Sequence, residues 1–365
     1  MTEEKKKRLH FADASKGISV LIIVFYHILE SEAAYPMIAG IIPCLLFVLF
    51  FYSGYFYSPG KRTFRENMTA KGKSILIPFF KYSLILWAIG TVIMMMRGEI
   101  PFPEAILCLR NFYAGCIWNR DIQNLFGWQY YQLGARYVYL ADFWFLPAMF
   151  FSCILFFPAA DAVIDDWKKG ITAIPVLLGI SGVLCHFRIT FAYNLHMIPY
   201  WAALMLTGVL VHRYRPIQKG GENRVRGILI SLAFLLAGAA CSIYFGYGEQ
   251  LFRGSFSNYT SEIPAMIILY ITGLMAALGL STLLSIMEES GIILKKIIWT
   301  GTNSLYFYLF HMFFAWLISL AVVFDLRHRA YPPDFWKSLM ISLASIACCA
   351  VYVWLREKVM NKTSV

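Results

Sequence analysis

The sequence predicts an all-α membrane protein, a polytopic bundle of about ten transmembrane helices with both termini in the cytoplasm. Of its 365 residues, 59% are hydrophobic and 15% are charged, whereas soluble domains carry roughly 25% charged residues. The mean hydropathy is +0.61. Runs of about 20 apolar residues, the length that crosses a bilayer, recur along the chain. Basic residues gather between alternate runs, as they do in cytoplasmic loops.

The apolar runs predict ten spans, from which we expect a single membrane-embedded domain, residues 1–365. The spans cover residues 15–32, 36–57, 75–96, 142–162, 171–187, 195–212, 227–246, 263–286, 302–324 and 336–356.

The longest connection, residues 97–141, is expected to be an extracytoplasmic loop within this domain. It contains prolines, many aromatic residues and a segment around 104–113 that predicts an interfacial helix. Cys108 and Cys116 also lie there. A disulfide between them and two free thiols both remain open.

The placement of lysine and arginine predicts the orientation. Of the 32 basic residues, 22 fall on the side that holds both termini and 9 on the other, while Lys81 lies inside the third span. This bias places the termini in the cytoplasm and the 97–141 loop outside. Cytoplasmic loops also explain the net charge of +11, so we expect the lipid bilayer and no nucleic acid as a partner.

The first span contains the residues around which we build the functional interpretation. Lys16 and His27 are 11 residues apart, so in a helix they project within about 20° of each other and roughly 16 Å apart along the axis. An ionisable side chain within the membrane is a candidate functional site. Glu30, three residues later, could orient the imidazole or could be a solvated acid of the outer loop.

The ninth span contains a second deep histidine. His311 follows Gly301 by ten residues, as His27 follows Gly17. Both spans run from inside to outside, so equal rise places both imidazoles about 15 Å deep. The two rings could flank one polar cavity, or they could be unrelated buried histidines.

Other polar positions have both a functional and a structural interpretation. Ser53 and Gly54 lie near the inner end of the second span, where they could contact a ligand or allow close helix packing. Lys73 belongs to a cytoplasmic basic loop that could attract a phosphorylated ligand. Asp142 and Trp144 open the fourth span, where an aromatic belt is the simpler explanation for the tryptophan.

Several motifs occur together in one order. They are Lys16 with His27, Phe50–Tyr55, Lys73–Phe79, Trp144–Ala148 and Gly301–His311. In these motifs the chain resembles the acyltransferase-3 family of integral membrane acyltransferases, which look like ten-helix bundles. The hallmark of that family is a basic residue, ten further residues and a histidine. The basic residue is usually arginine, and lysine differs from it in how it binds phosphate or carboxylate.

The resemblance implies transfer of an acyl group, most often acetyl, from cytoplasmic acyl-CoA to a hydroxyl of an extracytoplasmic carbohydrate. His27 would be the general base, with transient acyl transfer to His27 as the alternative. The resemblance implies acetyl-CoA as co-substrate, no metal, and a bacterial inner membrane. The expected site residues are Lys16, His27 and His311 for catalysis, Lys16, Ser53, Gly54, Lys73, Asn303 and Ser304 for the donor, and Glu30, Asp142 and Trp144 for the acceptor.

Two other classes of protein compete with this interpretation. A secondary transporter or flippase of a sugar-linked or anionic substrate would also need buried histidines, although such proteins tend to have inverted repeats. A non-catalytic sensor or assembly partner would not need the Lys16–His27 pair. The sequence leaves open the acceptor, acetyl or succinyl as the acyl group, and a monomer or a homodimer.

Overall fold

A computed structural model describes residues 9–29, 36–113, 140, 143–163, 166–187, 189, 191–214, 224–245, 262–286, 292–321 and 335–363. Within these ranges every regular element is a helix. The prediction of an all-α fold is therefore confirmed.

A helix covers each of the ten predicted spans. They are α1 (His10–Leu29), α2 (Pro36–Tyr55), α4 (Ile77–Met96), α8 (Phe145–Val163), α9 (Trp167–His186), α10 (Ile198–Tyr214), α12 (Arg224–Phe245), α14 (Glu262–Ile286), α16 (Ser304–Ala321) and α17 (Phe335–Thr363). Eight described helices are long and apolar enough to cross a membrane. In α2 and α12 the apolar stretches found among the described residues, Leu45–Tyr55 and Val225–Gly238, fall short of this length.

Several helices extend beyond the predicted spans or lie between them. The third span is preceded by α3 (Phe64–Lys71) and a π-helix, η1 (Gly72–Leu76). A capping box starts α3, because the Glu66 backbone N–H donates to the Thr63 hydroxyl and the Thr63 N–H donates back to the Glu66 carboxylate. A short 3-10 helix, η3 (Ala192–Met197), precedes α10, and α15 (Ile292–Thr302) precedes α16.

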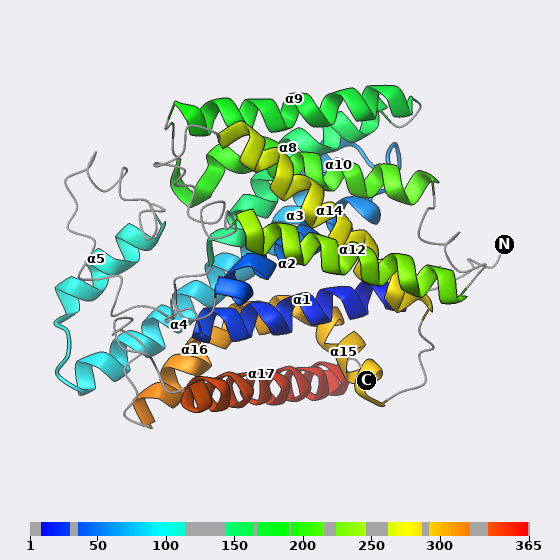
Figure 1. Ribbon diagram of the computed structural model, residues 1–365. Helices are drawn as coiled ribbons and strands as arrows, with labels where there is room; N and C mark the ends of the chain where they lie inside the picture. Colours follow the sequence, from blue (N-terminus) through cyan, green and yellow to red (C-terminus); the bar gives the residue numbers. More distant parts are fainter. Residues whose placement is uncertain are drawn as a thin grey trace.

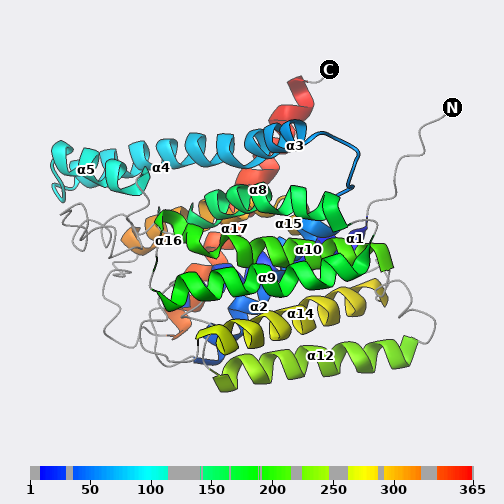
Figure 2. The ribbon, with the colours of Figure 1, turned by 90° about the horizontal axis from the view of Figure 1, so that it is seen from above.

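The connection after α4 contains the predicted interfacial helix as α5 (Phe102–Tyr113). This helix folds back on α4, where the indole N–H of Trp87 donates to the carbonyl of Ala105 at 3.0 Å. The two helices extend from one side of the bundle (Figures 1 and 2). Cys108 is a buried free thiol in α5, and Cys116 lies outside the described residues.

Helix α1 runs through the centre of the bundle (Figure 1). It packs against α2, α14, α15, α16 and α17. The residues of α1 that face these neighbours, among them Ala12, Val20, Ile23 and Val24, are almost fully buried. The helix that carries Lys16 and His27 is therefore an interior helix, and its polar side chains are directed at other helices.

Two glycines bring α1 and α15 into backbone contact. A Cβ atom added to Gly17 would meet the carbonyl oxygen of Ile297 and, at 3.1 Å, the backbone nitrogen of Gly301. A Cβ atom added to Gly301 would meet the carbonyl oxygen of Asp13 and lie 2.8 Å from the nitrogen of Gly17. Only glycine at both positions allows this approach, as at other close helix crossings in membranes.

Substitution of Gly301 by valine should therefore destabilise the protein. The new side chain would run into the backbone of α1, and overpacking of this kind costs about 1–3 kcal/mol. Thermal unfolding of the purified protein in detergent would measure the loss. Gly179 in α9 is the matched control, because nothing lies within 4 Å of a Cβ at that position. Gly179→Ala should unfold no earlier than wild type, and an unchanged Gly301→Val protein would contradict the close contact.

Candidate functional site

A cavity of about 490 Å³ lies among the C-terminal end of α2, the first half of α1, α3, η1 and α8. Three cationic side chains line it, those of Lys16, Arg62 and Lys71. The remaining lining residues are Leu49, Tyr52, Ser53, Phe56, Tyr57, Asn67, Ala70, Ser74 and Phe157. Three cations among aromatic walls would suit an anionic ligand that also has a flat or apolar part.

An ion pair holds Lys16 in the wall of this cavity. Its ammonium lies 2.7 Å from the carboxylate of Asp13, and the side chain of Asp13 is only 5% exposed. The ammonium also lies 5.9 Å from the ring centroid of Phe56. Because Lys16 itself stays 24% exposed, its charge remains accessible to an incoming anion.

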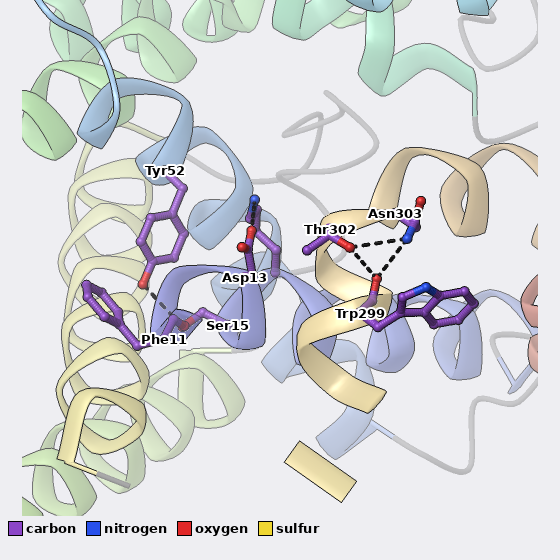
Figure 3. Close-up of polar contacts among 8 residues, drawn as sticks. Phe11, Asp13, Ser15, Tyr52, Trp299, Thr302 and Asn303 are labelled. Carbon is purple, nitrogen blue, oxygen red and sulfur yellow. Dashed lines mark hydrogen bonds and ion pairs between the residues drawn. The ribbon is translucent and has the colours of Figure 1, made fainter. Parts of the chain in front are cut away.

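Tyr52 ties the cavity wall to two neighbouring helices. Its hydroxyl donates to the hydroxyl of Ser15 at 3.2 Å (Figure 3). The same hydroxyl contacts the hydroxyl of Ser281 in α14. The ring is fully enclosed, with 1% of its surface exposed. These bonds fix α1, α2 and α14 to one another beside the cavity.

The opposite wall is anchored by Tyr57. Its hydroxyl donates to the carboxylate of Asp161 at 2.9 Å, and the backbone N–H of Gly60 donates to the same oxygen at 3.3 Å. Burial, followed by the hydrogen bond and charge of Asp161, raises the pKa of Tyr57, so the phenol stays protonated. The amide of Asn67 in α3 completes the connection with a 3.4 Å bond to the Tyr57 hydroxyl.

The two histidines expected at one depth lie together. The ring centroids of His27 and His311 are 5.4 Å apart, with 37° between the ring planes. His311 is buried, with 1% exposed, while His27 is half-buried. Two imidazolium rings this close would repel each other.

Backbone contacts fix the tautomer of His311. Its Nδ1 lies 2.7 Å from the carbonyl oxygen of Tyr308 and 3.2 Å from that of Phe307. Carbonyl oxygens can only accept, so Nδ1 carries the hydrogen and Nε2 of the neutral ring is the basic nitrogen. The carbonyl of His311 accepts from the hydroxyl of Ser345 at 2.6 Å, which joins α16 to α17.

Asn303 occupies the break between α15 and α16. Its amide donates to the carbonyl of Trp299 and to the hydroxyl of Thr302 (Figure 3). It also donates to the carboxylate of Glu357 in α17. The indole N–H of Trp299 also donates to Glu357, at 3.2 Å. Asn303 therefore holds the helix break, and Ser304 begins α16 directly after it.

The other expected site residues have different surroundings. Ser53 lines the cavity and bonds to the sulfur of Met149 at 3.6 Å. Gly54 packs against the backbone of Met205, where any Cβ would collide. Lys73 is exposed, and Trp144 is half-buried just before α8. Glu30 and Asp142 lie outside the described residues.

Two cavity cations, Arg62 and Lys71, were expected only as members of a basic loop and not as individual ligand-binding residues. Their cavity positions depend on α3 docking against α8, which the chain order of charges does not reveal. The signal that could have located α3 is the Thr63–Glu66 capping box. Among the described residues, no group of three or more His, Cys, Asp or Glu side chains could hold a metal ion.

The family model for an acyltransferase domain, of the acyltransferase-3 type, matches residues 9–354. The chain belongs to the acyltransferase-3 family. The match covers nearly the whole length, so this membrane protein is an acyltransferase in general class. Neither a curated protein nor a solved structure matched the chain.

The cation-lined cavity of this acyltransferase should bind polyanions. Pyrophosphate, used as a probe, should raise the melting temperature of the purified protein, because binding to the folded state stabilises it. Lys71→Gln should weaken pyrophosphate binding roughly tenfold through loss of a charge-assisted contact. Lys73→Gln removes the same charge two residues away, outside the cavity lining. Equal effects of the two substitutions would mean that general basicity, and not the cavity, attracts the anion.

Proposed function

We propose that this protein transfers an acetyl group from cytoplasmic acetyl-CoA to a hydroxyl of an extracytoplasmic carbohydrate, with His27 as the general base. The observation that carries the proposal is the pairing of His27 with His311 at a helical rise of roughly 16 Å from Lys16, which lines the cationic cavity. The family supports acyl transfer. The cations of the cavity support acetyl-CoA as the acyl donor. The histidine pair supports His27 as the general base.

The donor would bind with its charged end at the cavity. The phosphates of CoA carry several negative charges, which Lys16, Arg62 and Lys71 can neutralise. The aromatic side chains of Phe56 and Tyr57 in the same lining offer flat surfaces for the adenine ring. The pantetheine arm would then run along α1 and bring the thioester to the histidine pair.

The chemistry at the pair is a nucleophilic acyl substitution. His27 accepts the proton of the acceptor hydroxyl while that oxygen attacks the carbonyl carbon of the thioester. The tetrahedral intermediate collapses, the carbon–sulfur bond breaks, and the imidazolium returns its proton to the departing CoA sulfur. The products are an ester and CoA thiol. His311, with its proton fixed on Nδ1, places a second basic nitrogen near His27 and opposes a permanently charged His27.

The acetyl group would be transferred from the cytoplasmic side of the membrane to the outer side. The bias of basic residues supports a cytoplasmic cavity and a histidine pair nearer the outer side. The acceptor would approach from the side of the 97–141 connection, where Glu30, Asp142 and Trp144 would contact it. We propose the cytoplasmic membrane of a bacterium as the location, since acetyl-CoA and a surface carbohydrate then lie on opposite sides.

Replacement of His27 by alanine should abolish transfer. Loss of a general base lowers the rate by about 10²- to 10⁴-fold. The cavity proposed for acetyl-CoA, at Lys16, lies roughly 16 Å along α1 from His27 and is unchanged by the substitution. The measurement is transfer of radiolabelled acetyl from acetyl-CoA to envelope carbohydrate by the purified, reconstituted protein. The KM for acetyl-CoA should stay within about twofold of wild type, since only the chemical step is impaired.

The control for this experiment is Lys16→Gln, which should raise the KM for acetyl-CoA and leave the base in place. A His27→Ala protein that transfers at the wild-type rate would remove the proposed base. A wild-type protein that moves a sugar or an anion across vesicles without consuming acetyl-CoA would favour a transporter instead.

A further inference from the structure

The indole N–H of Trp201 is buried and has no hydrogen-bond acceptor among the described residues. Trp201 is 2% exposed and is the fourth residue of α10. Buried tryptophan N–H groups nearly always have a partner, because an unsatisfied buried donor costs free energy. A ligand that supplies an acceptor would remove this cost.

The ring of Trp201 is held in one position by its neighbours. It stacks on Phe50 of α2, with ring centroids 4.5 Å apart and 9° between the planes. Its centroid lies 6.4 Å from that of Trp144, just before α8. Tyr200 packs edge-on at 5.0 Å. A rigid donor among aromatic faces is the combination of apolar wall and placed polar group found in small-molecule sites.

Trp144 lies beside the end of α8 that is far from the cavity residue Phe157, while Trp201 stacks on Phe50, the neighbour of the cavity residue Leu49 in α2. Phe145, adjacent to Trp144, is 12 residues from the cavity residue Phe157 in α8, or about 18 Å of helix. Lys16 and His27 are separated by roughly 16 Å in α1. Aromatic contacts connect the two groups, because Phe145 lies 5.3 Å from Tyr308 and Tyr308 lies 6.1 Å from His311.

We propose that Trp201 is an acceptor-binding residue, whose indole N–H donates a hydrogen bond to a non-reacting hydroxyl of the carbohydrate. The inference rests on the proposed function and names a residue for its acceptor side. The charge of acetyl-CoA is matched by the three cations of the cavity, whereas the neutral indole N–H of Trp201 among aromatic rings suits a neutral, hydroxyl-rich ligand. A sugar ring offers hydroxyl oxygens to the N–H and apolar C–H faces to Trp144.

The test is Trp201→Phe, which keeps an aromatic ring beside Phe50 but removes the indole N–H. The acceptor probe is the surface carbohydrate of the expressing cells, stripped of O-acyl groups with mild alkali. The kcat/KM for this probe should fall at least about tenfold, since a site built around a hydrogen bond loses heavily when one partner is missing. The KM for acetyl-CoA should stay within about twofold of wild type.

Trp87→Phe is the matched control, because it also removes an indole N–H, in this case one bonded to Ala105 between α4 and α5. It should leave both kinetic constants unchanged. Trp201→Phe with wild-type kcat/KM for the carbohydrate would overturn the inference. A parallel rise in the KM for acetyl-CoA would overturn it too, since Trp201 would then serve the donor or the fold. If instead wild type transfers no acetyl while the protein is folded, the proposed function itself fails.

Discussion

The backbone contact between α1 and α15 is the constraint on which the rest of the site depends. Gly17 and Gly301 approach so closely that neither position has room for a methyl group. The contact sets two helices side by side and fixes their register at one point. His27 follows Gly17 by ten residues within α1, and His311 follows Gly301 by ten residues across the break into α16, so a similar rise brings the two rings to the same level. A 5.4 Å separation of His27 and His311 follows from this register.

The break between α15 and α16 at Asn303 preserves this register because hydrogen bonds hold the two helices together there. α15 ends at Thr302 and α16 begins at Ser304. A carboxylate from α17, that of Glu357, accepts from both Trp299 and Asn303 and so joins the two sides of the break to a third helix. The direction of α16, and with it the position of His311, therefore depends on the polar contacts at this break as well as on apolar packing.

The sequence predicted the helices and the histidine pair well because both follow from one-dimensional patterns. Apolar runs of sufficient length leave few alternatives to a span, and equal spacing from two glycines indicates equal depth. The cavity was less predictable, because it forms where α3 docks. Lys71 and Lys73 look equivalent in sequence, yet two residues on a helix point in nearly opposite directions, and only Lys71 lines the cavity. Trp201 belongs to none of the recognised motifs, and only the three-dimensional structure shows that its N–H has no partner among the described residues.

The charges at the cavity explain why a lysine can serve where the family usually has arginine. Asp13 neutralises Lys16 in the absence of a ligand, so the net attraction for an anion comes from Arg62 and Lys71. These two charges lie on the exposed side, where they steer an anion inward. In the proposed function, Lys16 would act as a compact charge that shifts from Asp13 toward a phosphate, and an ammonium can do this without the fixed geometry of a guanidinium. The proposed site would thus separate recognition of charge, at the cation-lined cavity, from proton transfer at the histidine pair.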